Sequence, residues 1–292
     1  MEVPSLHPGP ASLELLLLQG DHRLSHIWEG QLLTQTFRVR RVDDMWGFLR
    51  DHPLHPRIVR RLQDTSFYRI VEIGRLQLDW SLITTLIERW RLETHIFHLP
   101  IGEATITFQD VEPPDETALV GASRLQLTHV RQHLDALHTN ITDDTPELHI
   151  HRYTRLLLLL MFGGVLFPNT SGNLVSLRFL HHLERLDDLH QYSWGASVLG
   201  YLYKQMCWAS MGTQHDFAGF LPLLQVWALE WFLQLQPPLP PLAPGAPPPF
   251  LPLARRWVDR RGYGRAYEAR HNIPLCKDLL DFMEGVQQQA NS

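Results

Sequence analysis

Residues 79–108 constrain the fold of this chain more than any other segment, because they place a helix directly before a β-hairpin. Asp79 stands where its carboxylate can cap the first free N–H groups of the helix. Two β-prone runs then flank a turn at residues 100–103 that contains a proline and a glycine. The helix itself is indicated by apolar residues that recur at three- and four-residue spacing and so share one face. These residues are Leu82, Ile83, Leu86, Ile87 and Trp90.

Helix signals recur through the rest of the chain. Pro56 can open a short helix, because the N–H group that proline lacks has no partner in a first helical turn. A second short helix is expected between Ser66 as its cap and Gly74 as its stop. Apolar periodicity predicts further helices at residues 145–163, 174–190, 193–206 and 222–235. The sequence therefore predicts a mainly α fold: a multi-helix globular domain with a small β-hairpin, followed by a Pro-rich segment and a short C-terminal tail.

A proline-rich run, PPLPPLAPGAPPPFLP, divides the chain near its C-terminal end. Such a run cannot contribute to a packed core, and it is typical of a polyproline-II spacer or of a docking strip for an SH3- or WW-like partner. We therefore expect four parts. They are a flexible N-terminal tail at residues 1–25, a helical domain at 26–235, a Pro-rich linker at 236–252 and a tail rich in arginine and aromatic residues at 253–292.

The composition fits a folded domain. Hydrophobic residues make up 44% of the 292 residues, and the formal net charge of −5 gives no overall basic footprint for nucleic acid. Cys207 and Cys276 form no CxxC pair and predict free thiols in a reducing compartment. The N-terminus lacks the basic region of a signal peptide, and the most apolar run, residues 156–167, is shorter than the roughly 20 residues that cross a bilayer. We expect a soluble, intracellular protein with no membrane segment.

Residues 79–111 closely resemble the core signature of the plant mobile domain family, often labelled aminotransferase-like, which includes the maintenance-of-meristems proteins and copies carried by transposable elements. Further pieces of the resemblance lie between residues 37 and 231. The clearest are HIHRY at 149–153, YSWGASVL at 192–199 and GFLPLLQVWA at 219–228. The resemblance implies a nuclear protein involved in transposable-element silencing, gene expression control and meristem maintenance. It also implies nuclear protein partners, including partners like phosphoprotein phosphatase 7.

The chain departs from the family pattern after Val111, where the family continues into a leucine-rich helix. Here Pro113 and Pro114 forbid an uninterrupted helix. We therefore expect a shortened core segment at this point, which bears on both stability and activity. The sequence after Arg255 also differs from the usual continuation, which suggests a divergent or fused tail.

The sequence gives little support for catalysis. A pyridoxal-phosphate enzyme needs a Schiff-base lysine and a phosphate-binding loop, and neither lysine of this chain lies beside such a loop. His149 and His151 are two residues apart and point to different faces of a helix, and no HExxH or Cys/His finger accompanies them. Acidic pairs such as Asp187 and Asp188 are typical of helix ends and solvated faces. We expect no enzyme activity, no catalytic residue, no cofactor and no metal site.

Two groups of residues are candidates for contact with partners. On the signature segment, a shared surface is predicted from Trp80, Trp90, Arg91, His98 and Gly102; the competing interpretation is that these residues pack the helix and hairpin together. Beyond the proline-rich run, arginines alternate with tyrosines, a pattern that suits phosphate contact and base stacking but also a solvated helix. These arginines are Arg255, Arg256, Arg260, Arg261 and Arg265.

The resemblance and the lack of catalytic motifs lead to one main hypothesis, a non-enzymatic nuclear interaction module of the plant mobile domain type. Two alternatives stay open. The chain could be a transposon-derived relic without a selected activity, which the interruption at Pro113 and Pro114 suggests. It could also be the remnant of a metal-dependent nucleic-acid hydrolase, which would use acidic residues such as Asp187 and Asp188 to hold a divalent ion.

Overall fold

The computed structural model describes residues 21–23, 36–37, 44–99, 102–106, 124–212, 216–236, 254, 257 and 273–281. This part of the chain is mainly α-helical, with one three-stranded and one two-stranded antiparallel sheet. The helices are α2 (Asp44–Asp51), α3 (Pro56–Asp64), α4 (Tyr68–Ile73), α5 (Trp80–Glu88), α6 (Leu127–His138), α7 (Glu147–Met161), α8 (Phe179–Leu183), α9 (Trp194–Ala209), α10 (Leu221–Trp231) and α12 (Ile273–Asp281). Short turns of other helix types are the π-helical η4 (Phe162–Leu166) and the 3-10 helices η5 (Leu186–Gln191) and η6 (Leu233–Leu235). The strands are β1 (Trp90–Arg91), β2 (Ile96–Leu99), β3 (Gly102–Ala104), β4 (Arg124–Gln126) and β5 (Leu174–Ser176).

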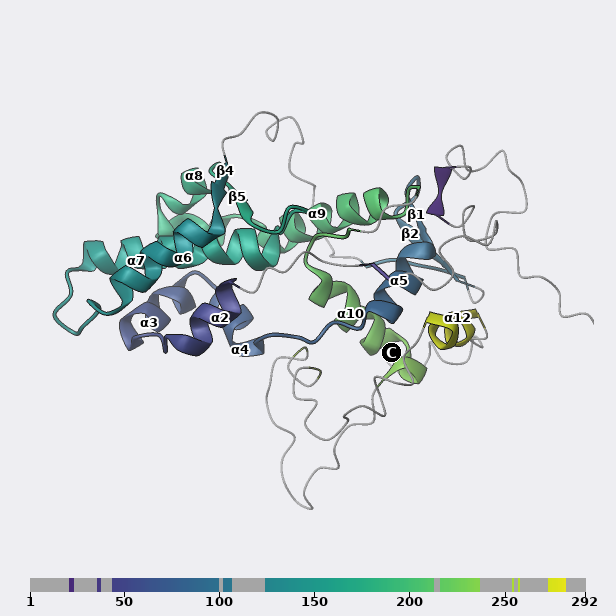
Figure 1. Ribbon diagram of the computed structural model, residues 1–292, viewed down its shortest axis with the longest axis horizontal. Coiled ribbons are helices and arrows are strands. Elements are labelled where there is room, and N and C mark those ends of the chain that lie inside the picture. Colours follow the sequence, from purple (N-terminus) through teal and green to yellow (C-terminus); the bar gives the residue numbers. More distant parts are fainter. Residues whose placement is uncertain are drawn as a thin grey trace, which may run out of the picture.

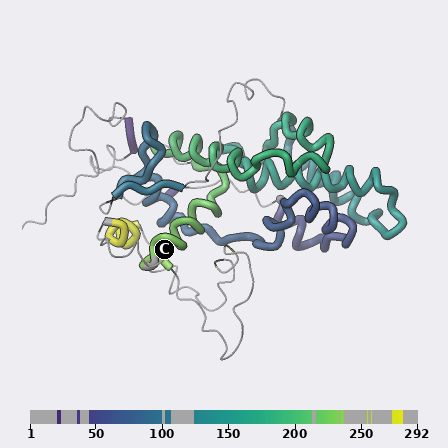
Figure 2. Tube along the Cα trace, turned by 180° about the vertical axis from the view of Figure 1, so that it is seen from behind, coloured from purple at the N-terminus to yellow at the C-terminus, as the bar shows by residue number. Residues whose placement is uncertain are grey.

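The molecule is elongated and has two hydrophobic cores, which α9 joins (Figure 1). One core lies under α5 and the three-stranded sheet and includes side chains of α10 and α12. The other lies among α2, α3, α6 and α7. Val198 near the start of α9 belongs to the second core, whereas Leu202 and Met206 belong to the first. With 16 residues, α9 is about 24 Å long, which is enough to contribute to both cores. The view from behind shows the same arrangement (Figure 2).

The predicted helix and hairpin of the signature segment both form, but Trp90 lies in β1 rather than on the helix, and β3 begins at Gly102, inside the predicted turn. The side chain of Asp79 accepts a hydrogen bond from the backbone N of Leu82 at 3.0 Å and caps α5. The apolar face of α5 is buried in the first core. β1 pairs with β2 so that Trp90 lies opposite Phe97, and β2 pairs with β3. The predicted mainly α fold with a small β-hairpin is therefore confirmed.

Two local predictions were wrong. The leucine repeat at 174–190 does not form one helix, because its first residues are β5 and its remainder is divided between α8 and η5. The side-chain amide of Asn169 donates to the carbonyl of Leu174, and β5 then forms its backbone hydrogen bonds with β4. A leucine at every third position also fits poorly to 3.6 residues per turn. Ser66 does not cap α4, since its φ of 66° is left-handed and Phe67 occupies the cap position.

A buried carboxylate ties distant parts of the chain to α5. Glu88 is 1% exposed, and its carboxylate lies 2.9 Å from the Nζ atom of Lys277 in α12 and 3.8 Å from the Nε atom of Arg23. Both contacts are ion pairs without hydrogen-bond geometry. Cys276 and Leu280 of α12 are fully buried in the same core. Residues from beyond the proline-rich run therefore complete the core of the signature helix.

The predicted boundaries of the four parts stay predictions. Most of the N-terminal tail, nearly all of the proline-rich linker, the proline pair at 113–114 and the five arginines of the basic cluster lie outside the described residues. Among the helices that are described, none is long and apolar enough to cross a membrane.

We predict that Lys277→Met lowers the free energy of unfolding by about 3 kcal/mol, because it removes the nearer partner of a buried carboxylate. Urea unfolding monitored by circular dichroism would measure the change. The control is Lys204→Met on the exposed surface of α9, which should change stability by less than about 0.5 kcal/mol. Equal effects of the two substitutions would show that the ion pair does not stabilise the fold.

A second prediction concerns Gly163 in η4, where an added Cβ atom would lie 2.5 Å from Cβ of Val175 and 2.8 Å from Cδ2 of Leu127. Gly163→Ala should lower the free energy of unfolding by about 1–3 kcal/mol through overpacking. Gly195 in α9 has no atom within 4 Å of such a Cβ, so Gly195→Ala should be neutral or stabilising by up to about 1 kcal/mol. Thermal unfolding of both variants tests the pair, and a stable Gly163→Ala protein would contradict the packing described for η4.

Candidate functional site

The two tryptophans of the predicted surface contribute to packing. Trp90 is fully buried, and its ring lies 4.8 Å from that of Phe97 and 5.0 Å from that of Tyr203, measured between centroids. Its Nε1 atom donates to Sγ of Cys207 at 3.4 Å. Trp80 at the start of α5 is partly buried against the same core. The ring of Trp90 therefore has no surface to offer to a partner.

The other three predicted residues lie on the three-stranded sheet. Arg91 is 4% exposed, its Nε and Nη2 atoms have no hydrogen-bond partner among the described residues, and burial lowers its pKa. His98 is half-buried opposite Glu103, and burial, with a smaller effect of Arg91, lowers the pKa of His98. Gly102 is exposed, with a left-handed φ of 129° that favours glycine. His98 and Gly102 are thus the members of this group that offer surface on the sheet.

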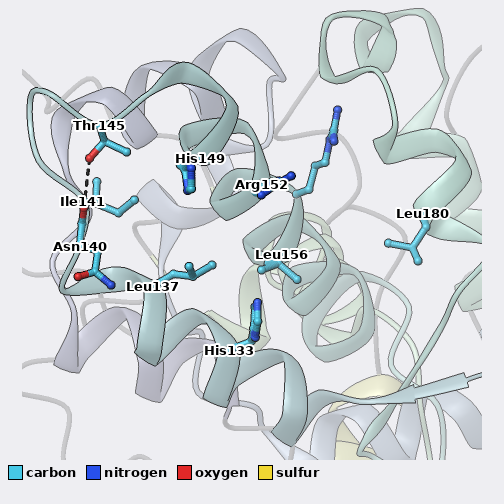
Figure 3. A pocket seen from close by; sticks show the side chains of 10 residues that line it. His133, Leu137, Asn140, Ile141, Thr145, His149, Arg152, Leu156 and Leu180 are labelled. Carbon is cyan, nitrogen blue, oxygen red and sulfur yellow. Dashed lines mark hydrogen bonds between the residues drawn. The ribbon is translucent and has the colours of Figure 1, made fainter.

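A hollow on the other end of the molecule, which we call the α6–α7 groove, was not predicted. It has a volume of about 380 Å³ and lies between α6, α7, their connecting loop and α8 (Figure 3). Its floor is apolar and is formed by Leu137, Ile141, Leu156 and Leu180. Its other side chains include four that are basic or can become so: His133, His149, Arg152 and Arg155.

The packing of α6 against α7 builds the groove. Leu134 of α6 and Ile150 and Leu157 of α7 are buried in the second core and fix the two helices side by side. The hydroxyl of Tyr153 and Nδ1 of His138 form a hydrogen bond of 2.8 Å between the same helices. The groove residues of α7, at positions 149, 152 and 156, share a face of the helix because they are three and four residues apart.

The loop between α6 and α7 closes one end of the groove. Oγ1 of Thr145 donates to the carbonyl of Asn140 at 3.2 Å and accepts from the backbone N of Thr142 at 2.8 Å (Figure 3). The sequence suggests Thr145 as the cap of α7 and Pro146 as its first helical residue, but this was wrong. Pro146 occupies the cap position without a capping hydrogen bond, and Thr145 organises the loop instead. The guanidinium of Arg57 donates to the carbonyls of Asp143 and Thr145 from the side of α3. With these contacts the loop is anchored at several points, and the groove is formed before any ligand binds.

The charge of the groove is positive. None of the described residues that line it is acidic. Arg152 is exposed and has no hydrogen bond or ion pair within the described part of the chain. Arg155 donates from Nη2 to the backbone carbonyl of Glu184, while its buried Nε has no hydrogen-bond partner there. The geometry therefore offers an apolar floor beside guanidinium groups.

The acidic residues considered for metal binding lie in ion pairs. Oδ1 of Asp187 is 3.1 Å from Nη1 of Arg61, and Oδ2 of Asp188 is 2.9 Å from Nε of Arg185. In the part of the chain that the structure describes, no group of three or more His, Cys, Asp or Glu side chains is placed to hold a metal ion. Each carboxylate thus pairs with a guanidinium, whereas in the remnant of a metal-dependent hydrolase it would bind a divalent ion.

Sequence reasoning missed the groove because its signal is weak. Basic residues at positions 149, 152 and 155 of an amphipathic helix look the same as a solvated face. The floor also combines residues from three helices and one loop, and one of these helices, α8, belongs to the segment 174–190 that was predicted as a single longer helix.

Comparison with known proteins identifies the family. The model described as Plant mobile domain matches residues 66–113 and 116–289, with a gap that contains Pro114. The match continues beyond Arg255, so the expectation of a divergent or fused tail was wrong. The chain is 34% identical over 260 residues to the Serine/threonine-protein phosphatase 7 long form homolog of Arabidopsis thaliana, which covers 79% of this chain and 19% of that protein. It is 30% identical over 253 residues to Protein MAIN-LIKE 1 of the same plant, covering 75% of this chain and 48% of the relative.

A further relative is Protein MAINTENANCE OF MERISTEMS of Arabidopsis thaliana, 27% identical over 233 residues, which are 70% of this chain and 48% of the relative. The chain thus spans between about a fifth and about half of the length of these curated relatives. No solved structure matches the chain.

The ion pairs of Asp187 and Asp188 predict how the protein responds to divalent metal. Addition of 10 mM Mg²⁺ or Mn²⁺ should leave the unfolding temperature unchanged, because the two carboxylates bind arginines. A specific site with a Kd of about 1 mM would instead raise the stability by about 1.4 kcal/mol at that concentration. Differential scanning fluorimetry distinguishes the two results. Stabilisation that Asp187→Asn abolishes would support the hydrolase alternative.

Proposed function

Because this chain belongs to the plant mobile domain family, we propose that it is a non-enzymatic interaction module that acts in the plant nucleus. Two named relatives give the proposal its direction. One is named as a homolog of a serine/threonine-protein phosphatase 7 long form and another for the maintenance of meristems. The proposed roles are silencing of transposable elements, control of gene expression and maintenance of meristems. The proposed partners are nuclear proteins, including proteins like phosphoprotein phosphatase 7.

The lengths of the relatives support a module. The region similar to this chain makes up 19% of one relative and 48% of two others, so it occurs within proteins of different size. A domain that recurs in this way is suited to bring the proteins that carry it to a common partner. Its own surface must then supply the recognition.

The observation that carries the proposal is the α6–α7 groove. Its anchored loop, its apolar floor and Arg152, which has no partner among the described residues, are typical of a surface that binds another protein, because anchored loops lower the entropy lost on binding. The acidic residue at the start of α7 is already paired with arginines of α3. Glu147 at the start of α7 binds Arg57 at 2.8 Å and Arg61 at 3.3 Å, and the hydrogen bond from Arg57 lowers the pKa of Glu147.

The test is affinity purification of the full chain from plant nuclear extract, with mass spectrometry of the retained proteins. We expect a reproducible set of nuclear proteins that is enriched over a tag-only control and is retained after nuclease treatment. The nuclease step separates protein contacts from contacts through nucleic acid. A fluorescent fusion should also accumulate in the nucleus. A chain that unfolds cooperatively but retains nothing would contradict the module and favour a relic.

A further inference from the structure

The floor of the α6–α7 groove presents apolar side chains to solvent in a concave surface. Leu180 of α8 is 44% exposed, and Leu137 and Leu156 lie between it and the connecting loop (Figure 3). Concave apolar surface of this kind marks binding sites more often than single exposed leucines on convex surface do. The ligand that fits this floor brings apolar side chains of its own.

The length of the groove fits two turns of a helix. On α7 the lining residues run from His149 to Leu156, a rise of about 10 Å. A helix laid in a groove between two helices contacts it through residues spaced i, i+3 or i+4, and i+7. The groove therefore has room for two or three such anchors, which matches its volume of about 380 Å³.

The charge around the floor selects the polar part of the ligand. Arg152 is exposed and has no ion pair in the described part of the chain, and Arg155 lines the groove beside it while one of its nitrogens donates to the carbonyl of Glu184. A free guanidinium binds a carboxylate with two parallel hydrogen bonds, so Arg152 suits an acidic side chain beside the apolar anchors, and Arg155 adds a second positive charge. A ligand with basic side chains would be repelled.

Nucleic acid fits the groove less well than protein. Single-stranded nucleic acid binds to aromatic side chains on which its bases stack, and the groove floor consists of leucine and isoleucine. A phosphate group would satisfy the arginines but would leave the apolar floor uncovered. An amphipathic acidic peptide would cover the apolar floor and pair with the arginines at the same time.

We propose that the α6–α7 groove binds an acidic amphipathic helix of a partner protein, with its apolar side chains on the leucine floor and its carboxylates on Arg152 and Arg155. The inference rests on the proposed function, since it names the surface and the chemistry by which the module recognises its partner. The recognised feature is a pattern of two or three leucine-type residues at helical spacing, flanked by aspartate or glutamate.

The probe is a fluorescein-labelled peptide of about 16 residues, long enough to form a helix on binding, with leucines at i, i+3 and i+7, glutamates beside them and alanine elsewhere. Fluorescence anisotropy with the purified full chain measures its affinity. Arg152→Glu and Leu180→Gln should each weaken binding about tenfold or more, because each removes one contact of a different kind. Both residues are exposed, so the variants should fold, which circular dichroism would check.

Matched controls lie outside the groove. Arg60→Glu changes another exposed arginine, on α3, and Leu148→Gln changes a leucine of α7 that is 56% exposed but does not line the groove. Neither should alter the affinity. A second peptide with lysine in place of every glutamate should bind the unmodified protein weakly and Arg152→Glu more tightly. This exchange of preference would identify direct contact between Arg152 and the acidic side chains.

Several results would overturn the inference. One is that the groove variants and the control variants change the peptide affinity equally. Another is that the protein binds laurate, an apolar chain with a single carboxylate, but not the peptide. Self-association that Arg152→Glu abolishes would assign the groove to a second copy of the chain instead. The proposed function can fail independently of this inference. If the Arg152→Glu variant still retains the nuclear proteins, the protein is an interaction module but the groove is not its binding site. If the peptide binds but no nuclear partner is found, the groove binds such helices but the proposed function is wrong.

Discussion

The burial of Glu88 is the constraint on which the rest of this structure depends. It places a carboxylate inside the core at the end of α5, and an isolated ion in such a place costs several kcal/mol. Its partners are Arg23, far before it in the sequence, and Lys277, far after it. The helix of the family signature therefore reaches its buried position only when both distant segments have joined it. The fully buried ring of Trp90, two residues further on, depends on the same closure.

The second constraint is α9, which holds the two cores at a fixed separation. Val198 packs in one core and Met206 in the other, and the hydroxyl of Tyr201 donates to the carbonyl of Pro168 at 2.9 Å, where the chain leaves η4. The three-stranded sheet and the helices α6 and α7, which form the groove, consequently lie at opposite ends of the molecule (Figure 1). Changes in one of these surfaces need not disturb the packing of the other, which is the property that makes groove variants informative.

Features that depend on local periodicity and helix capping could be predicted from the sequence. Features that depend on residues far apart in the sequence could not. Asp79 and the apolar face of α5 carry their own signals, so the helix was predicted with nearly the observed limits. The hairpin was predicted, but β1 was missed and β3 begins two residues earlier than expected. Glu88 carries no such signal, since a single acid in a helix looks like a solvated position until its partners are known. The prediction of Trp90 as surface had the same difficulty, because a tryptophan after a helix fits a binding site and a core equally well. The groove could not be found at all, since its walls come from α6, α7 and α8.

The positive charge of the groove follows from how α7 divides its polar residues between two faces. Glu147 and His151 are four residues apart and face α3, with 3.2 Å between Oε1 of Glu147 and Nε2 of His151. Nη2 of Arg61 in α3 lies 2.6 Å from the same Nε2 atom. The ion pairs of Glu147 with Arg57 and Arg61 hold α3 against α7 and use the acidic residue at the start of the helix. The opposite face carries Arg152, and no acidic residue lines the groove among the residues that the structure describes. Stability and the proposed recognition thus use different faces of one helix. The packing that neutralises Glu147 on one side leaves Arg152 exposed on the other side, where the proposed ligand would bind.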